Sequence, residues 1–490
     1  MWSLLILSIL VVIVSESSKF EESFTIGENG RVGPILEGPM YGTDGGFIGI
    51  VTGVPFVGFE GTASFVDVKS ENALAANLTI FHTSSLELLN IFNRDIPFYE
   101  RRINASSMCD NEGMASRDAL LAFGRLDDYQ TFPLNGQSSQ VSFKSLVART
   151  GYQYIVFILC RNSKTLADEV TVEVSGELSF KNPYGYLPAR YYGFLPFLGL
   201  LSCAYLVLLL VFGYLVFRHR STMLKMQWGI LGVVIMGLIE TTTWFMTYVV
   251  MNDTGETSCC PWRSDIVFAM FAKNLKQTVS GLLVLAVALG WGVVKASLSR
   301  RMTLIVLLLG FFYLAFSVKF DLVRMEQISK TDRTTNNEDE EQPEGSETAF
   351  WAFPVAFCDV VFILSIYFAL VETCIQLEAD RQHAKLQMYQ TLVSTLKLWG
   401  LLWFGFTIFD LLTRIGFIPW PWTLEFLLWG FWDLFYFFVL LRIAIIWRPT
   451  ETSDRYAYSA QLPTADVLDE FETQEFEANS DARELELAKN

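Results

Sequence analysis

The chain has 490 residues, of which 52% are hydrophobic and only 18% are charged, and Phe alone occurs 41 times. About a quarter of the residues of a typical soluble domain are charged, so this composition excludes a wholly soluble protein. The net charge of −16 lies mostly in segments 326–347 (eight acidic and two basic residues) and 450–490 (eleven acidic and three basic residues). With no basic stripe elsewhere, the charge argues against nucleic acid as a partner.

Residues 1–17 are predicted to form a signal peptide. A short apolar run from Leu4 to Val14 is followed by Ser15-Glu16-Ser17, small residues at a spacing typical of cleavage, although the usual Lys or Arg before the run is missing. A membrane anchor would need about 20 apolar residues, so that alternative is weaker.

Residues 18–185 are predicted to form an exported antiparallel β-sandwich. Apolar and polar side chains alternate from Val170 to Phe180, which is the pattern of a strand with one buried face. Residues 152–159 form an uninterrupted run of β-formers, as expected for a strand that is covered on both faces.

Two kinds of covalent modification are expected in this exported domain. Its only cysteines, Cys109 and Cys160, most simply form one disulfide, although two free thiols are the alternative. Asn77 and Asn104 each begin an acceptor triplet for N-glycosylation. The triplet at Asn252 lies so close to a predicted membrane helix that we do not expect it to be used.

Residues 186–448 are predicted to cross the membrane seven times. Seven windows have the length and apolar character of a membrane-spanning helix, and so many could not be buried together in one soluble globule. The windows are residues 191–217, 227–251, 265–294, 302–325, 349–374, 392–414 and 423–447.

The charges of the short loops predict the orientation of these helices. Lys and Arg are concentrated after the first, third and seventh windows, and such loops face the cytosol. The domain before the first helix is therefore expected to be lumenal or extracellular, and the C-terminus cytosolic. The basic residues are Arg218, Arg220, Lys225, Lys295, Arg300, Arg301, Arg442 and Arg448.

Five charged residues lie well inside the predicted helices. Each is about 8 to 13 residues into its window, which at about 1.5 Å per residue places it near mid-depth. Unpaired charges are costly there, so these side chains should face one another or a wet cavity. Two interpretations stay open: an ion-pair network that fixes helix packing, or a polar cavity for a lipid headgroup, an ion or a segment of cargo. The residues are Glu240, Lys273, Lys276, Asp359 and Asp433.

The protein is not expected to be an enzyme, and it is not expected to bind a metal or a cofactor. The three histidines, His82, His219 and His383, all lie outside the windows, so no zinc site or Ser–His pair can be assembled in the membrane. The third window ends in Gly290-Trp-Gly-Val-Val-Lys295, without the Asp/Glu-Arg-Tyr of rhodopsin-type receptors.

Residues 449–490 are predicted to form an acidic, disordered and solvated cytosolic tail. A docking segment for a sorting adaptor is the functional alternative. Tyr456 and Tyr458 lack the bulky apolar residue that would complete the common tyrosine sorting signal.

Several separate motifs resemble the lung seven-transmembrane receptor family, also called GOST proteins, for Golgi-dynamics-domain seven-transmembrane helix proteins. The motifs are Asn182-Pro-Tyr-Gly-Tyr-Leu-Pro188, Leu195-Pro-Phe-Leu-Gly-Leu200, Lys276-Gln-Thr-Val-Ser280, Leu289-Gly-Trp-Gly-Val-Val-Lys295 and Trp447-Arg-Pro-Thr450. Together they cover about residues 180–460 in the family's order.

The resemblance implies a Golgi-dynamics β-sandwich in the lumen, residence in Golgi and post-Golgi membranes, and a role in sorting or escorting cargo. The expected partners are membrane lipid, a lumenal cargo, and coat or adaptor proteins that bind the tail. An ion channel or transporter built on the mid-membrane charges is the alternative function, and an orphan signalling receptor is the third.

Overall fold

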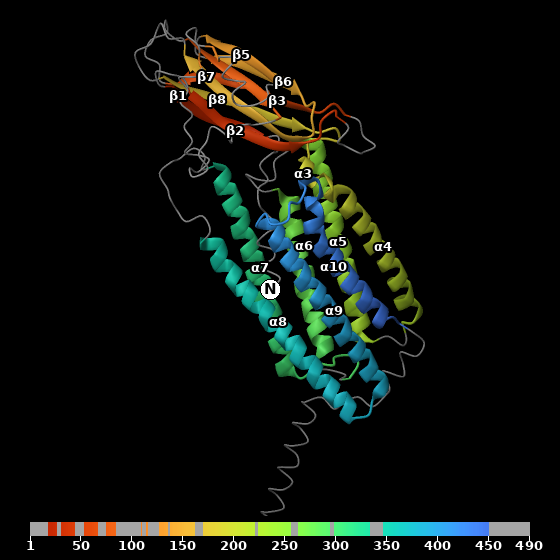
Figure 1. Ribbon diagram of the computed structural model, residues 1–490. Coiled ribbons are helices and arrows are strands. Elements are labelled where there is room, and N and C mark those ends of the chain that lie inside the picture. Colours follow the sequence, from red (N-terminus) through yellow and green to blue (C-terminus); the bar gives the residue numbers. More distant parts are fainter. Residues whose placement is uncertain are drawn as a thin grey trace, which may run out of the picture.

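The computed structural model describes residues 18–26, 31–44, 53–66, 75–84, 109, 114–115, 127–135, 138–161, 170–220, 224–255, 263–294, 298–333 and 346–449. Figure 1 shows a sandwich of strands set on one end of a bundle of long helices. The predicted signal peptide, Asn104 and the acidic tail beyond residue 449 lie outside the described residues.

The N-terminal domain consists of two four-stranded antiparallel sheets. One sheet has the order β1-β8-β3-β6 and the other has the order β2-β7-β4-β5. The strands are β1 (Ser18–Ile26), β2 (Arg31–Met40), β3 (Phe56–Val66), β4 (Ala75–Thr83), β5 (Asp128–Asn135), β6 (Ser138–Leu146), β7 (Gly151–Arg161) and β8 (Val170–Lys181). The predicted β-sandwich is therefore confirmed.

The core of the sandwich follows from the alternation of side chains along its strands. On β6 the residues are alternately exposed and buried, as a strand with one solvent-facing side requires. Phe59 of β3 and Phe157 of β7 meet across the two sheets with ring centroids 5.2 Å apart. The inward side chains of both sheets form one apolar cluster that includes Val57, Leu78, Ile80, Val141, Phe143, Ile155, Val172 and Val174.

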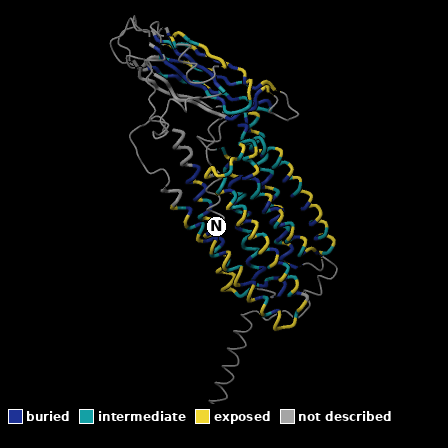
Figure 2. Tube along the Cα trace, viewed as in Figure 1, coloured by how far each residue is buried: buried dark blue, intermediate teal, exposed yellow. Residues whose placement is uncertain are grey.

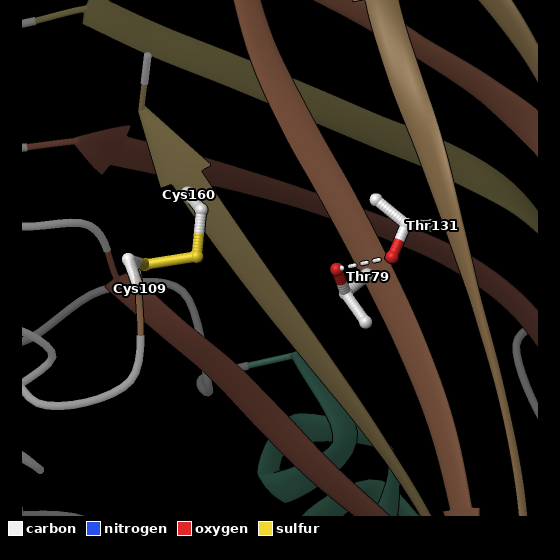
Figure 3. Close-up of a disulfide and its surroundings, with 4 residues drawn as sticks. All are labelled: Thr79, Cys109, Thr131 and Cys160. Carbon is white, nitrogen blue, oxygen red and sulfur yellow. Dashed lines mark hydrogen bonds between the residues drawn. A yellow bond between two sulfur atoms is a disulfide. The ribbon is translucent and has the colours of Figure 1, made fainter. Parts of the chain in front are cut away.

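The outer face of the β2-β7-β4-β5 sheet is also covered. Thr79 and Phe81 point away from the inter-sheet core, yet both are almost fully buried. On this face Cys160, near the end of β7, forms the predicted disulfide with Cys109, and the hydroxyls of Thr79 and Thr131 lie 3.0 Å apart (Figure 3). The disulfide thus fastens Cys109 to the sheet.

The C-terminal part is a bundle of long helices that follow the short α3 (Ala189–Tyr192). They are α4 (Phe194–Arg218), α5 (Lys225–Thr254), α6 (Ser264–Ala288), α7 (Arg300–Arg333), α8 (Ser346–Ala379), α9 (His383–Arg414) and α10 (Glu425–Ile446), with a 3₁₀ turn, η6 (Trp422–Leu424), before α10. Among the described residues, six helices are long and apolar enough to span a membrane. The other long helix, α6, is less apolar because Lys273, Asn274, Lys276 and Gln277 interrupt it.

The outside of the bundle is apolar, as a membrane protein requires. Figure 2 shows exposed residues along the outer faces of the helices and buried residues between them. Large side chains such as Phe217, Phe353 and Phe417 are 73–77% exposed. Such surfaces are favourable in hydrocarbon and unfavourable in water, so the chain is a multi-pass membrane protein.

Candidate ligand cavity in the helix bundle

A cavity of about 120 Å³ lies inside the bundle, towards the end that carries the N-terminal domain. Residues of α4, α5, α6, α9 and α10 line it, together with Tyr191 of α3. Its size approaches that of an engineered protein cavity of roughly 150 Å³ that binds benzene. Most of its wall is aromatic, contributed by Tyr191, Phe194, Trp244, Tyr248, Trp403, Trp429, Trp432 and Tyr436.

A buried ion pair joins α5 to α6 at the wall of this cavity. The carboxylate of Glu240 contacts the ammonium of Lys276, and the side chains are 3% and 4% exposed. The same ammonium lies 4.1 Å from the ring centroid of Tyr436, a cation–π contact. The pairing explains how two charges can stay in the membrane interior, because each neutralises the other.

Two further charged residues line the cavity and keep part of their surface open. Lys273 and Asp433 are each partly exposed, whereas Glu240 and Lys276 are buried. The cavity therefore combines two cations and two carboxylates with a largely aromatic wall. Such a site suits a largely apolar ligand that also carries one positive and one negative charge.

Asp359 does not line this cavity. It is buried on α8, where it forms a hydrogen bond with the hydroxyl of Tyr313 on α7. Neighbouring side chains, Cys358 and Phe362, belong to a separate apolar cluster between α7 and α8. Of the five mid-depth charges picked out from the sequence, the structure thus brings four together and places the fifth between other helices.

A second polar network, between α6 and α7, was not predicted from the sequence. The side-chain amide of Asn274 donates to Asp321 over 2.7 Å, and the hydroxyl of Ser317 donates to the carbonyl oxygen of Asn274 over 2.6 Å. All three residues are buried. Two features of the sequence could have indicated this network. Asn274 lies between Lys273 and Lys276, and Asp321 lies inside the fourth apolar window.

The N-terminal domain contacts the bundle next to Tyr191, which lines the cavity. Arg190 forms an ion pair with Glu425 at the start of α10, 2.7 Å apart, and donates to the hydroxyl of Tyr152 on β7 over 3.0 Å. The ring of Trp422 lies 5.5 Å from that of Tyr41 in the N-terminal domain. One arginine therefore links a strand of the sandwich to the helix that supplies Trp429, Asp433 and Tyr436 to the cavity.

The chain between the domain and the bundle is held by two asparagines. Asn182 accepts from the backbone N–H of Tyr41 over 2.9 Å and donates to the carbonyl of Leu187 over 3.1 Å. At the end of α5, the side chain of Asn252 donates to the carbonyl of Tyr184 over 2.9 Å and accepts from the N–H of Leu187. The amide of Asn252 is thus occupied, which gives a physical reason why its acceptor triplet would not be used.

Fold and cavity together define a class of protein: a multi-pass membrane protein with an N-terminal antiparallel β-domain and a helix bundle that contains a charged, aromatic cavity. The family model described as "GOST, seven transmembrane domain" matches residues 193–454, more than half of the chain. The chain belongs to the GOST family.

Several curated proteins are similar to this chain. Membrane protein PTM1 of Saccharomyces cerevisiae (strain YJM789) is 29% identical over 298 residues, which cover 59% of this chain and 53% of that protein. Transmembrane protein 87B of Mus musculus is 25% identical over 374 residues, or 74% of this chain and 61% of that protein. Transmembrane protein 87A of Xenopus tropicalis is 25% identical over 350 residues, which cover 68% of this chain and 57% of that protein. The matches therefore span between about half and three fifths of these relatives.

Proposed function

We propose that this protein sorts or escorts cargo in Golgi and post-Golgi membranes, with its N-terminal domain in the lumen and its C-terminus in the cytosol. The observation that carries the proposal is the cavity, in which aromatic side chains surround Glu240, Lys273, Lys276 and Asp433. Membership of the GOST family supports the trafficking role. The role is binding and escort rather than catalysis.

The chemistry of the cavity favours an amphiphilic occupant. A lipid headgroup or a modified segment of cargo can place charge near Lys273 and Asp433 and apolar atoms against the tryptophans. Because the two carboxylates balance the two ammonium groups, a simple cation or anion would find no net charge to bind. This balance favours a zwitterionic or apolar group over a bare ion.

The position of the N-terminal domain supports its participation in cargo binding. Arg190 and Trp422 join that domain to α10, and α10 forms one wall of the cavity. Cargo bound to the domain near these contacts would lie close to the cavity. On the cytosolic side, the acidic tail is the proposed docking segment for coat or adaptor proteins.

Complementation in cells that lack the protein tests the proposal. Wild-type chain and a Trp432→Ala variant, which enlarges the cavity, would be expressed with Trp399→Ala as the control. Trp399 also packs on α10, against Phe435, but does not line the cavity. We expect the wild type and the control to restore the distribution of Golgi cargo, and Trp432→Ala to fail. Normal cargo distribution without the protein, and no partner captured by its N-terminal domain, would reject the proposal.

The rival function is an ion channel or transporter, and the charged wall of the cavity is the observation in its favour. Reconstitution of the purified full-length chain into vesicles separates the two functions. Ion flux that is present in the wild type and abolished by Glu240→Gln or Lys276→Met would favour the channel. Absence of flux, with cargo missorting in cells expressing Trp432→Ala, would favour the escort function.

A further inference from the structure

Lys385 lies at the distal end of the bundle, which we define as the end farthest from the N-terminal domain. It is the third residue of α9 and is 2% exposed. Within the part of the chain that the structure describes, its ammonium has no hydrogen-bond partner and no ion-pair partner. A buried charge without a partner is strongly disfavoured, so we expect an anion to pair with this ammonium.

The surroundings of Lys385 follow from its position on the helix. Lys385 and Tyr389 are four residues apart, so they share one face of α9. That face points into the bundle, because Tyr389 is fully buried and its hydroxyl donates to the carbonyl of Val287 at the end of α6 over 2.8 Å. The ring of Tyr389 lies 5.9 Å from the ring of Trp447, just beyond α10.

Trp447 presents a second buried donor without an acceptor. Its indole N–H is buried and has no hydrogen-bond acceptor among the described residues. Nearby carbonyls already accept from side chains: Val287 from Tyr389, Ala288 from Thr373, and Trp447 itself from Gln227. An ammonium and an indole N–H can only donate. Tyr389 thus shares a helix face with one of these donors and a ring contact with the other, and an acceptor with negative charge would satisfy both.

We propose that this site binds a carboxylate from the first residues of the chain's own acidic tail, either Glu451 or Asp454. The proposal does not depend on the proposed trafficking function. Residues 450–490, outside the described part, follow directly on Trp447, Arg448 and Pro449 and carry eleven acidic side chains against three basic ones. Charge complementarity therefore matches the tail to the buried ammonium.

Chain length favours Glu451 and Asp454 over a free anion. Glu451 is four residues beyond Trp447, so an extended chain keeps it within about 14 Å of that residue. A group on so short a tether has an effective concentration of the order of millimolar or more, without an external ligand. The phosphate of a lipid headgroup has suitable chemistry as well, but it lacks this tether, and bound phospholipid is an outcome that the experiment distinguishes.

Zero-length cross-linking of the full-length protein in nanodiscs tests the proposal. A carbodiimide activates a carboxyl group, and the amine of Lys385 then displaces the resulting urea, which forms an amide with net loss of one water. We expect mass spectrometry to find Lys385 linked to Glu451 or Asp454. Lys385→Met and the double variant Glu451→Gln/Asp454→Asn should each abolish this product. The control is Lys397→Met, at an exposed lysine of the same helix, and should leave it unchanged.

Limited trypsin cleavage after Arg455 gives an independent readout. Because breaking a buried ion pair is costly, we expect cleavage to be at least about tenfold faster in Lys385→Met and in the double tail variant than in wild type and Lys397→Met. If Lys385→Met failed to fold, the tail variant would still decide the question. Glu378 is an exposed carboxylate near the end of α8, and cross-links from Lys385 to Glu378 alone would overturn the proposal. So would loss of bound anionic phospholipid in Lys385→Met without any cross-link to the tail.

Discussion

At the scale of single residues, the protein buries polar side chains in two different ways. In the bundle, the carboxylate of Glu240 lies against the ammonium of Lys276. In the N-terminal domain, the ring of the buried His82 hydrogen-bonds to two uncharged side chains: Nδ1 lies 2.9 Å from Ser145 Oγ and Nε2 lies 2.9 Å from Gln153 Oε1. The amide nitrogen of Gln153 donates to Arg149, so its oxygen faces His82 and the neutral imidazole donates through Nε2.

The burial of His82 predicts that acid weakens the folded domain. Burial lowers the pKa of His82 below 6.5, although Gln153, Asp127 and Asp128 oppose the shift. The unfolded chain then binds more protons than the folded chain, so stability falls as pH drops below 6.5, by at most about 1.4 kcal/mol per pH unit. Melting temperatures measured between pH 7.5 and 5 should show this slope. His82→Gln should flatten it, and the exposed His383→Gln should not; equal slopes in all three proteins would contradict the prediction.

Removing one partner of the buried ion pair should be costly. Glu240→Gln leaves Lys276 charged and unpaired, so we expect a loss of about 3–5 kcal/mol of stability. Thermal unfolding of the full-length protein in detergent, followed by tryptophan fluorescence, measures the change. The double variant Glu240→Gln/Lys276→Met should recover much of the loss, and Glu372→Gln, at an exposed glutamate of α8, should change little. A loss below about 1 kcal/mol for Glu240→Gln would mean that the pair behaves like a surface pair.

At the scale of helices and strands, the domain and the bundle are joined at α3, η6 and the start of α10. These short segments carry Arg190, Trp422 and Glu425, which contact Tyr152 and Tyr41 of the sandwich or one another. The tyrosine rings of Tyr184 and Tyr192 add a contact with centroids 4.1 Å apart. The joint is thus built from polar and aromatic contacts at one edge of the sandwich.

Breaking the arginine bridge should loosen the domain on the bundle. With Arg190→Gln, the ion pair to Glu425 is lost, so the spread of distances between spin labels at Ser142 of β6 and Leu434 of α10 should widen. Both positions are exposed. Arg263→Gln is the matched control, because Arg263 pairs with Asp265 at the start of α6, only two residues away. Unchanged distance distributions in Arg190→Gln would show that the aromatic contacts alone hold the joint.

At the scale of the whole molecule, the proposed orientation predicts where a glycan is attached. Asn77 lies on β4, opposite Cys160 in the register of the sheet. If the N-terminal domain enters the lumen, the chain expressed in animal cells should lose mass on treatment with an N-glycosidase, and Asn77→Gln should reduce that shift. Asn252→Gln should leave the shift unchanged, because the side chain of Asn252 is occupied. No shift from Asn77 or Asn104 would contradict the orientation.

The membrane helices and some of the strands could be predicted from the sequence alone. Alternating side chains marked β8, a run of β-formers marked β7, and long apolar windows marked the membrane helices, because these patterns depend only on the local period of a strand or helix and on the thickness of the membrane. The two cysteines of the N-terminal segment were enough to predict the disulfide, since neither had another cysteine to pair with there. The strand and helix patterns are local in the sequence, and two cysteines allow only one disulfide.

The contacts between side chains of different helices could not be predicted from the sequence. Depth in the membrane follows from counting residues at 1.5 Å each, so Asp359 and Asp433 looked equivalent in the sequence. Which helix each side chain faces depends on how the helices pack, and this places Asp433 in the cavity and Asp359 against Tyr313. The sheet order β2-β7-β4-β5, the Asn274–Asp321 contact and the Arg190 bridge likewise join segments far apart in the chain, and no local pattern encodes such partners.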